Sequence, residues 1–404
     1  MIRPADKGRR VLLVAPQSFF AVAGTPFNVL QMCRSLTEAG YEVHLATLPG
    51  GETVPLPNLT HHRAPGLPGI ARVPVGFSWA KAVYDVLLCL LVLRLLIGRR
   101  FIAIHAVEEA AFFAIPLARL FGTAAVMDLD SDICGQLRQR RGASARLAGP
   151  AGALRRWSLR TATCAVTVAP ALTHLVAEVS PGTPVFEIAD TPLDAALQAP
   201  SPAEVAHLRR TLGEAEAQWI VYTGNLDARQ GVERLVEAMP RVLDRRPDAA
   251  LLVVGGEAEE VRRLEALAAR LGVGARVRCV GKHPPASMPA FMALAAALVS
   301  PRLEPLVTPL KIFSYMASGR PIVATDLPTH TAVLDDRTAI LVPPTSEGLA
   351  GGILAALEQP ERAARLGEQA RRAALSEYGY DRFKRQMLGL YAFVAPRAGR
   401  AATA

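Results

Sequence analysis

The chain has 404 residues, 51% of them hydrophobic and 20% charged, which excludes wholesale disorder and leaves room for two domains with cores of their own. Its net charge is +9, and its isoelectric point near 9.7 suits an anionic partner such as nucleic acid, a phosphorylated substrate or a phospholipid surface. Only 6% of the residues are aromatic and no basic run alternates with aromatics, so we expect no nucleic acid among its partners.

The cysteines indicate a reducing compartment. They are odd in number, scattered and without a CxxC pair, so neither a disulfide framework nor a zinc site is predicted. The apolar run from Val11 to Ala15 follows a basic N-terminus but is too short for the core of a signal peptide. We therefore predict a cytoplasmic protein whose first regular element is a buried strand at 11–15.

The first half of the chain alternates strands with helices. After the strand at 11–15, a helix that starts at Thr25-Pro26 and closes at Gly40 leads into a second strand at 41–47. This strand–helix–strand order predicts a parallel sheet. The segment 49–74 is rich in glycine and proline and is interpreted as a long excursion. A helix is expected at 108–121, and further strands at 101–106, 124–129, 162–169 and 185–188.

A strongly apolar helix is predicted at 79–100, with Trp79, Lys81 and several arginines at its edges. Its uncharged stretch between Asp85 and Arg94 is far shorter than the roughly 20 residues that a bilayer span needs. Two interpretations stay open: a helix buried in the domain, or one that lies partly in a membrane interface. The arginine-rich segment 138–160 likewise predicts either a solvated helical face or a patch for an anionic surface.

The pattern starts again after a linker at 190–202. Strands are predicted at 219–223, 250–254, 277–280, 297–300, 322–325 and 340–342, with a helix at 231–243 after the first of them. We predict two doubly wound, Rossmann-like α/β domains, residues 1–195 and 203–377, and a C-terminal helix with a tail at 378–404 that crosses back to the first domain. Two such domains place a ligand in the cleft between them, at the carboxyl ends of the strands.

A short helix between the predicted strands 297–300 and 322–325 has clear start and stop signals. Thr308 is a candidate N-cap, Pro309 suits the first helical position, and Gly319 suits the left-handed position after the last turn. Lys311 then lies in the first turn, beside amides without a helical partner, where a phosphate or diphosphate would bind. Capping alone also fits a purely structural helix with a solvated lysine.

Several motifs together resemble one enzyme family. They are Gly24-Thr25-Pro26, Ile104-His105-Ala106 with Glu108, Tyr222-Thr223-Gly224-Asn225, Thr308-Pro309-Leu310-Lys311 and Gly319-Arg320-Pro321. From about residue 11 to 380 the chain resembles the retaining glycosyltransferases of family 4, which have the two-domain GT-B fold. The resemblance implies transfer of a sugar from a nucleoside-diphosphate donor, held mainly by the second domain. It implies a glycolipid, polysaccharide or small-molecule acceptor on the first domain, and no cofactor besides the donor.

The resemblance also implies roles for single residues. Glu304 would hold hydroxyls of the donor sugar, Lys311 and Asn225 would contact the diphosphate, and His330 would face the cleft. The residues implied in catalysis are His105, Glu108 and Glu304. Those implied in binding the donor are Gly24, Thr25, Asn225, Arg229, Thr308, Pro309, Leu310, Lys311, Ser314 and His330.

The chain departs from the family pattern in four places. Ser314 stands where a second glutamate is expected on the ribose, and Val107 replaces the second histidine of a His-x-His-Glu run. Asn225 and Gln230 replace a common Arg and Lys, so that Arg229 is the remaining cation nearby. These changes are typical of a subgroup with a Ser in place of the second motif glutamate. They also leave open a binding or scaffold protein that has lost turnover; a GT-B-type epimerase has less support.

The segment Asp128-Leu129-Asp130-Ser131-Asp132 allows two interpretations. Clustered carboxylates attract hard cations, whereas carboxylates at strand ends also serve as turn or acceptor contacts. Because such a fold stabilises its leaving group with helix termini and basic residues, we favour acceptor contacts and expect no metal. Peripheral contact with the anionic inner face of the plasma membrane is a further expectation, from the basic balance and the helix at 79–100.

Overall fold

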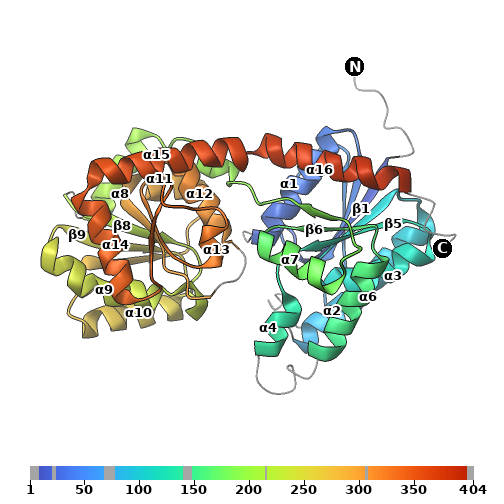
Figure 1. Ribbon diagram of the computed structural model, residues 1–404, viewed down its shortest axis with the longest axis horizontal. Coiled ribbons are helices and arrows are strands. Elements are labelled where there is room, and N and C mark those ends of the chain that lie inside the picture. The colour runs from blue at the N-terminus through green and yellow to red at the C-terminus, as the bar shows by residue number, and fades with distance from the viewer. Residues whose placement is uncertain are drawn as a thin grey trace. The chain divides into compact units, whose positions relative to one another are not determined.

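The computed structural model describes residues 9–20, 24–67, 78–139, 148–213, 216–304 and 308–397 (Figure 1). The described chain divides into two compact units. The first contains the residues up to Asp190 and those from Tyr380 onward, and the second runs from Thr191 to Gly379. Each unit has its own parallel sheet, with helices on both faces (Figure 1). The two doubly wound α/β units predicted from the sequence are therefore confirmed.

The sheet of the first unit has seven strands in the order β3-β2-β1-β4-β5-β6-β7. The chain begins in the middle of the sheet, since Val11 of β1 lies opposite Val43 of β2 and Ala103 of β4. The order reverses between β1 and β4, which makes the carboxyl ends of these strands the natural place for a ligand. The strands are β1 (Arg10–Ser18), β2 (Glu42–Leu48), β3 (Leu59–Arg63), β4 (Ala103–Val107), β5 (Ala124–Leu129), β6 (Cys164–Thr167) and β7 (Val185–Glu187).

The last helix of the chain completes the core of the first unit. Apolar side chains of α1 such as Met32 and Leu36 share one buried cluster with Phe383, Leu390 and Tyr391 of α16. The helices of this unit are α1 (Gly24–Glu38), α2 (Trp79–Gly98), α3 (Ala111–Leu120), α4 (Ile133–Gln139), α6 (Ala148–Thr161), α7 (Pro170–Val179) and α16 (Tyr380–Val394), with the 3₁₀ turns η1 (Glu108–Ala110) and η6 (Ala395–Arg397). No helix in the described part of the chain is long and apolar enough to cross a membrane.

The sheet of the second unit has six strands in the order β10-β9-β8-β11-β12-β13. The strands are β8 (Gln218–Thr223), β9 (Ala249–Val254), β10 (Val277–Gly281), β11 (Ala295–Ser300), β12 (Ile322–Thr325) and β13 (Ile340–Val342). The helices are α8 (Pro202–Leu212), α9 (Val232–Arg245), α10 (Ala258–Arg270), α11 (Met288–Leu294), α12 (Leu310–Ser318), α13 (Pro328–Thr331), α14 (Ser346–Glu358) and α15 (Pro360–Glu377). The 3₁₀ turns are η2 (Asp194–Leu197), η3 (Ala228–Gln230), η4 (Gly274–Arg276) and η5 (Pro285–Ser287).

The structure corrects two expectations about local structure. The excursion predicted at 49–74 contains β3, which pairs in parallel with β2; part of the range lies outside the described residues. Thr308 is not an N-cap: α12 begins at Leu310 after Pro309, whose ψ of 135° is extended and which makes no side-chain capping bond. In the first unit, α1 already begins at Gly24, so Thr25 lies inside the first turn. Gly319 does end α12 in the left-handed conformation, with φ 70°, as predicted.

Candidate active site

In the second unit, Lys311 in the first turn of α12 points back to the carboxyl end of β8. Its Nζ donates to the hydroxyl of Tyr222 at 2.8 Å and to Oε1 of Gln230 at 3.2 Å. The same ammonium lies 3.9 Å from the centre of the Tyr222 ring, a cation–π contact. All these partners are neutral. Burial, and after it the nearby charge of Arg302, lowers the pKa of Lys311 to about 7, while the charge of Asp227 opposes the shift. The site therefore holds a cation whose charge is poorly compensated.

Two arginines extend this cationic region. Arg302 lies two residues beyond the end of β11, and its Nε is buried without a hydrogen-bond partner among the described residues. Burial lowers its pKa, and the charge of Arg229 adds to that effect. Arg229 is half-exposed and pairs with Asp227 at 3.2 Å. The negative charge of the partly exposed Glu304 is near enough to raise the pKa of Arg302 and so to oppose these effects. Arg302 was not among the predicted site residues, although its position in the loop just after a buried strand was the available signal.

Two glycines allow the loops to approach one another closely. A Cβ at Gly224, where φ is 135°, would lie 2.6 Å from Nζ of Lys311. At Gly231, where φ is 70°, it would lie 2.0 Å from the carbonyl oxygen of Pro301. Both left-handed conformations favour glycine, and at Gly231 the backbone carbonyl of Pro301 also leaves no room for a Cβ. Asn225 follows Gly224, and its carbonyl oxygen accepts the hydroxyl hydrogen of Tyr222. The predicted residues Asn225, Arg229 and Lys311 are thus brought together in one loop cluster.

The first turns of α12 present further unused groups. Thr308 is buried, and Pro309 and Leu310 are partly exposed. The amides of Leu310 and Lys311 come too early in the helix for an α-helical acceptor, whereas the amide of Ile312 donates to the carbonyl oxygen of Pro309 at 2.9 Å. Ser314 lies one turn beyond Leu310; it is 5% exposed, and its Oγ has no partner within the described protein. A buried hydroxyl without a partner costs free energy unless a ligand uses it. This end of α12 therefore combines amides, an ammonium and a spare hydroxyl.

His330 does not face a ligand, which corrects the prediction from its sequence position. It is fully buried, with Nδ1 donating to the carbonyl oxygen of Thr325 at 2.8 Å and Nε2 accepting from the hydroxyl of Ser300 at 2.9 Å. Burial lowers its pKa to about 4, so the ring is neutral. His330 instead fastens α13 to the carboxyl ends of β11 and β12.

His105, in the first unit, is also a buried structural residue and has no surface with which to touch a substrate. Its Nε2 donates to Oδ2 of Asp128 at 2.9 Å, and its Nδ1 lies 3.1 Å from the hydroxyl of Tyr391. The histidine is fully buried, and Asp128 is 1% exposed. This arrangement corrects the predicted catalytic role: His105 links β4, β5 and α16, and it fixes the orientation of the Asp128 carboxylate.

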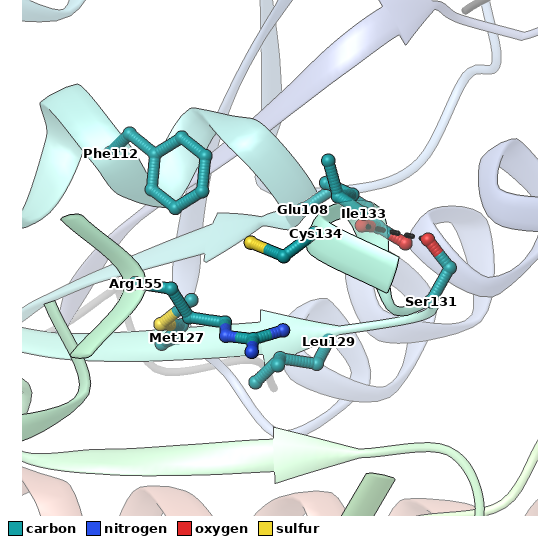
Figure 2. Close-up of a pocket in the computed structure, with 8 residues that line it drawn as sticks. All are labelled: Glu108, Phe112, Met127, Leu129, Ser131, Ile133, Cys134 and Arg155. Atoms are coloured by element: carbon teal, nitrogen blue, oxygen red, sulfur yellow. Dashed lines mark hydrogen bonds between the residues drawn. The ribbon is translucent and has the colours of Figure 1, made fainter. Parts of the chain in front are cut away.

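Glu108 does lie at an accessible place, at the wall of a small pocket beside the ends of β4 and β5. Its φ is 54°, a left-handed conformation unusual for a non-glycine residue, and it accepts a hydrogen bond from Ser131 at 3.3 Å. Figure 2 shows this bond on one side of the pocket, with Phe112 on the opposite side. The lining residues are Glu108, Phe112, Met127, Leu129, Ser131, Ile133, Cys134 and Arg155.

Several carboxyl groups gather near this edge of the sheet. Burial raises the pKa of Glu108 well above its usual range, with Asp130 and Glu109 adding to the rise. The pKa of Asp130 is also raised well above its usual range, first by burial and then by the charge of Asp128. Hydrogen bonds from Thr25 and Asn28 oppose this shift. Burial, and after it Asp128, raises the pKa of Asp190 to about 7. The first turn of α1, expected to bind phosphate through Gly24 and Thr25, thus already holds a carboxyl group.

The three aspartates of the 128–132 segment make separate contacts. Asp128 pairs with His105, Asp130 with Asn28, and Asp132 accepts from Nη1 of Arg155 at 2.6 Å. Arg155 is buried, so the arginine-rich segment is not simply a solvated face. Within the described residues, no group of three or more His, Cys, Asp or Glu side chains is arranged to hold a metal ion.

The candidate sites of the two units differ in chemistry. The second unit offers cations and unpaired amides, which attract a diphosphate and stabilise negative charge as it develops. The first unit offers an apolar pocket with a carboxyl group that holds its proton more tightly than usual, which suits contacts with hydroxyl groups and proton transfer.

Models of known protein families match each of the two units separately. Residues 24–185 match the family model described as "Glycosyl transferase 4-like domain", and residues 217–359 match "Glycosyl transferases group 1". The chain is 24% identical to a phosphatidyl-myo-inositol mannosyltransferase of Mycolicibacterium smegmatis over 87% of this chain and 86% of that protein. It is 29% identical to an alpha-D-kanosaminyltransferase of Streptomyces kanamyceticus over 47% of this chain, and spans about half of that protein, 49%.

Solved structures share the fold. Sucrose-phosphate synthase from Thermosynechococcus elongatus has a TM-score of 0.79 at 23% identity, covering 95% of this chain and 98% of that chain. HepE of Anabaena, solved with UDP and glucose, has a TM-score of 0.74 at 18% identity, covering 95% of this chain and 99% of that chain. The GT-B fold predicted from the sequence is confirmed, and the protein is a glycosyltransferase. With one matching model on each unit, the chain belongs to the family 4-like glycosyltransferases.

Proposed function

We propose that the protein moves a sugar from a nucleoside-diphosphate donor to a glycolipid, polysaccharide or small acceptor, with retention at the anomeric carbon. The observation that carries the proposal is Lys311, a part-buried ammonium with neutral partners, set in the first turn of α12 beside Arg302. A departing nucleoside diphosphate gains negative charge as the anomeric bond breaks. Preorganised cations and amides stabilise that charge more strongly than water does.

The same loop cluster offers contacts for the diphosphate, the ribose and the sugar of the donor. The amides of Leu310 and Lys311 and the ammonium of Lys311 would bind the diphosphate. Ser314, with its spare hydroxyl, would reach the ribose in place of a glutamate, and Glu304 would hold hydroxyls of the donor sugar. Because these cations supply the positive charge, the reaction would use no resident metal or further cofactor. Unchanged turnover in the presence of a chelator is the expected result.

The acceptor would bind to the first unit, at the pocket beside Glu108. A carboxyl group with a raised pKa is a stronger base than an ordinary carboxylate and can return the proton that it accepts, which suits activation of an acceptor hydroxyl. The relatives named as mannosyltransferases of phosphatidyl-myo-inositol support a lipid-linked acceptor. Such an acceptor would place the protein on the inner face of the plasma membrane as a peripheral, cytoplasmic enzyme.

A panel of UDP-, GDP- and dTDP-sugars tests the donor. Thermal stabilisation and release of free nucleotide are both expected with at least one member of the panel. Lys311→Ala should abolish or strongly weaken both, whereas Lys282→Ala, at a lysine 65% exposed and paired with Glu257 in the same unit, should leave them unchanged. Stabilisation without release, in the presence of candidate acceptors, would instead favour a binding or scaffold protein that has lost turnover. No stabilisation and no release from any donor would refute the proposal. The anomeric configuration of the product, read by NMR, tests retention.

A further inference from the structure

The solvent-facing side of α2 is mostly apolar, with Arg94 as its one exposed charged residue. Five large hydrophobic side chains on this helix are strongly exposed: Trp79 by 90%, Val83 by 46%, Val86 by 59%, Leu90 by 56% and Ile97 by 71%. At 3.6 residues per turn they fall within about 40° of a single line along the helix. We call these five residues the α2 stripe.

The stripe is separate from the part of α2 that packs into the first unit. Buried residues lie on the opposite side of the helix: Lys81, Tyr84, Leu88, Val92, Leu95 and Leu96. The sequence left open whether this helix is buried in the domain or lies partly in a membrane interface. One face of α2 is buried in the domain, and the second interpretation concerns only the exposed face. A helix that faces water normally carries polar residues on its outer side. The stripe thus marks an interaction surface and not a requirement of the fold.

Charges around the stripe are basic. The one acidic residue of α2, Asp85, pairs with Lys81 at 2.5 Å, and Lys81 also contacts Glu109 at 2.6 Å. Arg94 is exposed on the flank of the stripe, and the exposed Arg99 and Arg100 follow the end of the helix.

We propose that the α2 stripe docks in the headgroup region of an anionic phospholipid bilayer. An exposed tryptophan at one end, an aliphatic row and flanking arginines are the features of a helix that lies in a membrane interface. A second copy of the chain is the less suitable occupant. Two-fold pairing through the stripe would bring together the same basic face of two copies, each with a net charge of +9. An anionic bilayer attracts those arginines instead.

The stripe is also connected to the acceptor pocket. Lys81, close to Trp79, contacts Glu109, the neighbour of Glu108. The Trp79 end of α2 therefore lies near the 3₁₀ turn that carries Glu108, a residue of the pocket wall. Resting on the proposed function, this placement would bring the pocket to the membrane surface, where a lipid-linked acceptor presents its hydroxyl groups. The docking itself needs no donor and no acceptor.

Sedimentation with lipid vesicles tests the docking in the absence of nucleotide. The full chain is mixed with vesicles of phosphatidylcholine alone or with equal parts of phosphatidylglycerol. We expect binding to the anionic vesicles that falls by about tenfold or more in Val86→Glu/Leu90→Glu, because each buried apolar side chain contributes to partition. Leu375→Glu is the matched control, since Leu375 on α15 is 53% exposed but lies in the other unit. Its binding should equal that of the wild type.

The charge requirement has its own control. Arg94→Gln/Arg99→Gln/Arg100→Gln should weaken binding to anionic vesicles, whereas removal of the same charge from the exposed Arg262, Arg263 and Arg270 of α10 should weaken it far less. Equal binding of wild type and Val86→Glu/Leu90→Glu, or equal binding to neutral vesicles, would overturn the proposal. So would a wild-type dimer that the double variant dissociates. If the double variant unfolds, Val86→Ser/Leu90→Ser takes its place. Because the assay contains no sugar nucleotide, its failure would not bear on the donor site.

Discussion

The ammonium of Lys311 lies 2.8 Å from the hydroxyl oxygen of Tyr222 and 3.9 Å from the centre of the same ring. This lysine is thus held by a neutral phenol and not by a carboxylate. Water has been partly removed from the ammonium, and the charge of Asp227 compensates only in part for that loss, so that the pKa is lowered to about 7. The unliganded protein therefore maintains a strained electrostatic arrangement that an anionic ligand would relieve.

Replacing Lys311 by Met should stabilise the unliganded protein in a pH-dependent way. The folded pKa, about 7, is below that of an unfolded lysine near 10.4, so the unfolded chain binds the extra proton between these values. Stability of the wild type accordingly falls as the pH is lowered from about 10 to about 7, and no further below that. The advantage of Lys311→Met should grow over this window to about 1–3 kcal/mol, measured by denaturant unfolding at several pH values. Lys282→Met, at an exposed site, should show no such growth.

Binding of a nucleoside diphosphate should be accompanied by proton uptake above pH 7. At pH 8 most Lys311 side chains are neutral by the same pKa, and a bound diphosphate favours the charged form. Calorimetric titrations in two buffers with different ionisation enthalpies would measure the protons taken up. The nucleoside without phosphates should bind without uptake, and Lys311→Met should abolish uptake with the diphosphate. Uptake that persists in Lys311→Met would assign it to another group.

Arg155 should stabilise the first unit far more than its neighbour Arg138 does. Both contact Asp132, but Arg155 is buried at 2.6 Å whereas the side chain of Arg138 is 57% exposed at 3.6 Å. Loss of a buried charged partner costs about 1–3 kcal/mol, while exposed pairs contribute little. We expect Arg155→Ala to lower the free energy of unfolding by that amount and Arg138→Ala to leave it within about 0.5 kcal/mol of the wild type. Equal effects of the two substitutions would show that Asp132 needs neither partner specifically.

Asp190→Asn should stabilise the protein at neutral pH but not at pH 4. Burial, followed by the charge of Asp128, raises the folded pKa of Asp190 to about 7, so ionisation favours the unfolded chain as the pH rises from about 4 to about 7. The gain in melting temperature should increase across this window and then level off. Asp335 provides a control of opposite sign. Burial acts to raise its pKa, but hydrogen bonds from Arg337 outweigh burial and lower it. The advantage of the wild type over Asp335→Asn should therefore stay constant from about pH 4 to about pH 7 and shrink only as the pH is lowered below about 4.

Most of the fold follows from local pattern. Apolar runs such as that of β1, with helices of regular spacing between them, indicated the strands of both sheets before any contact was known. The strand β3 escaped prediction because its sequence, LTHHR, has few apolar residues and lies at the edge of the sheet beside β2. Similarly, a Thr-Pro pair before a helix does not distinguish a capping threonine from one that simply precedes the cap.

The site was predictable where its chemistry is local, and not where distant partners decide. Lys311 and Asn225 could be placed from the motifs around them. His105 and His330 also follow the pattern of strand-end residues, yet their partners Tyr391 and Ser300 come from other elements and bury both rings. No local pattern reports such a partner. Arg302 was overlooked for a similar reason, because its electrostatic environment depends on Arg229, which comes from another loop of the cluster.

The position of α16 in the core of the first unit has a consequence for synthesis of the protein. The second unit occupies one uninterrupted stretch of chain, Thr191–Gly379, whereas the first unit needs Phe383, Leu390 and Tyr391 to close the cluster around β1. A growing chain on the ribosome supplies α16 last, and domains generally fold as whole units. The unit that is translated first is therefore the last to complete its core. Its elements β1 and α1 cannot bury their apolar side chains fully until α16, more than 300 residues downstream, has been synthesised (Figure 1).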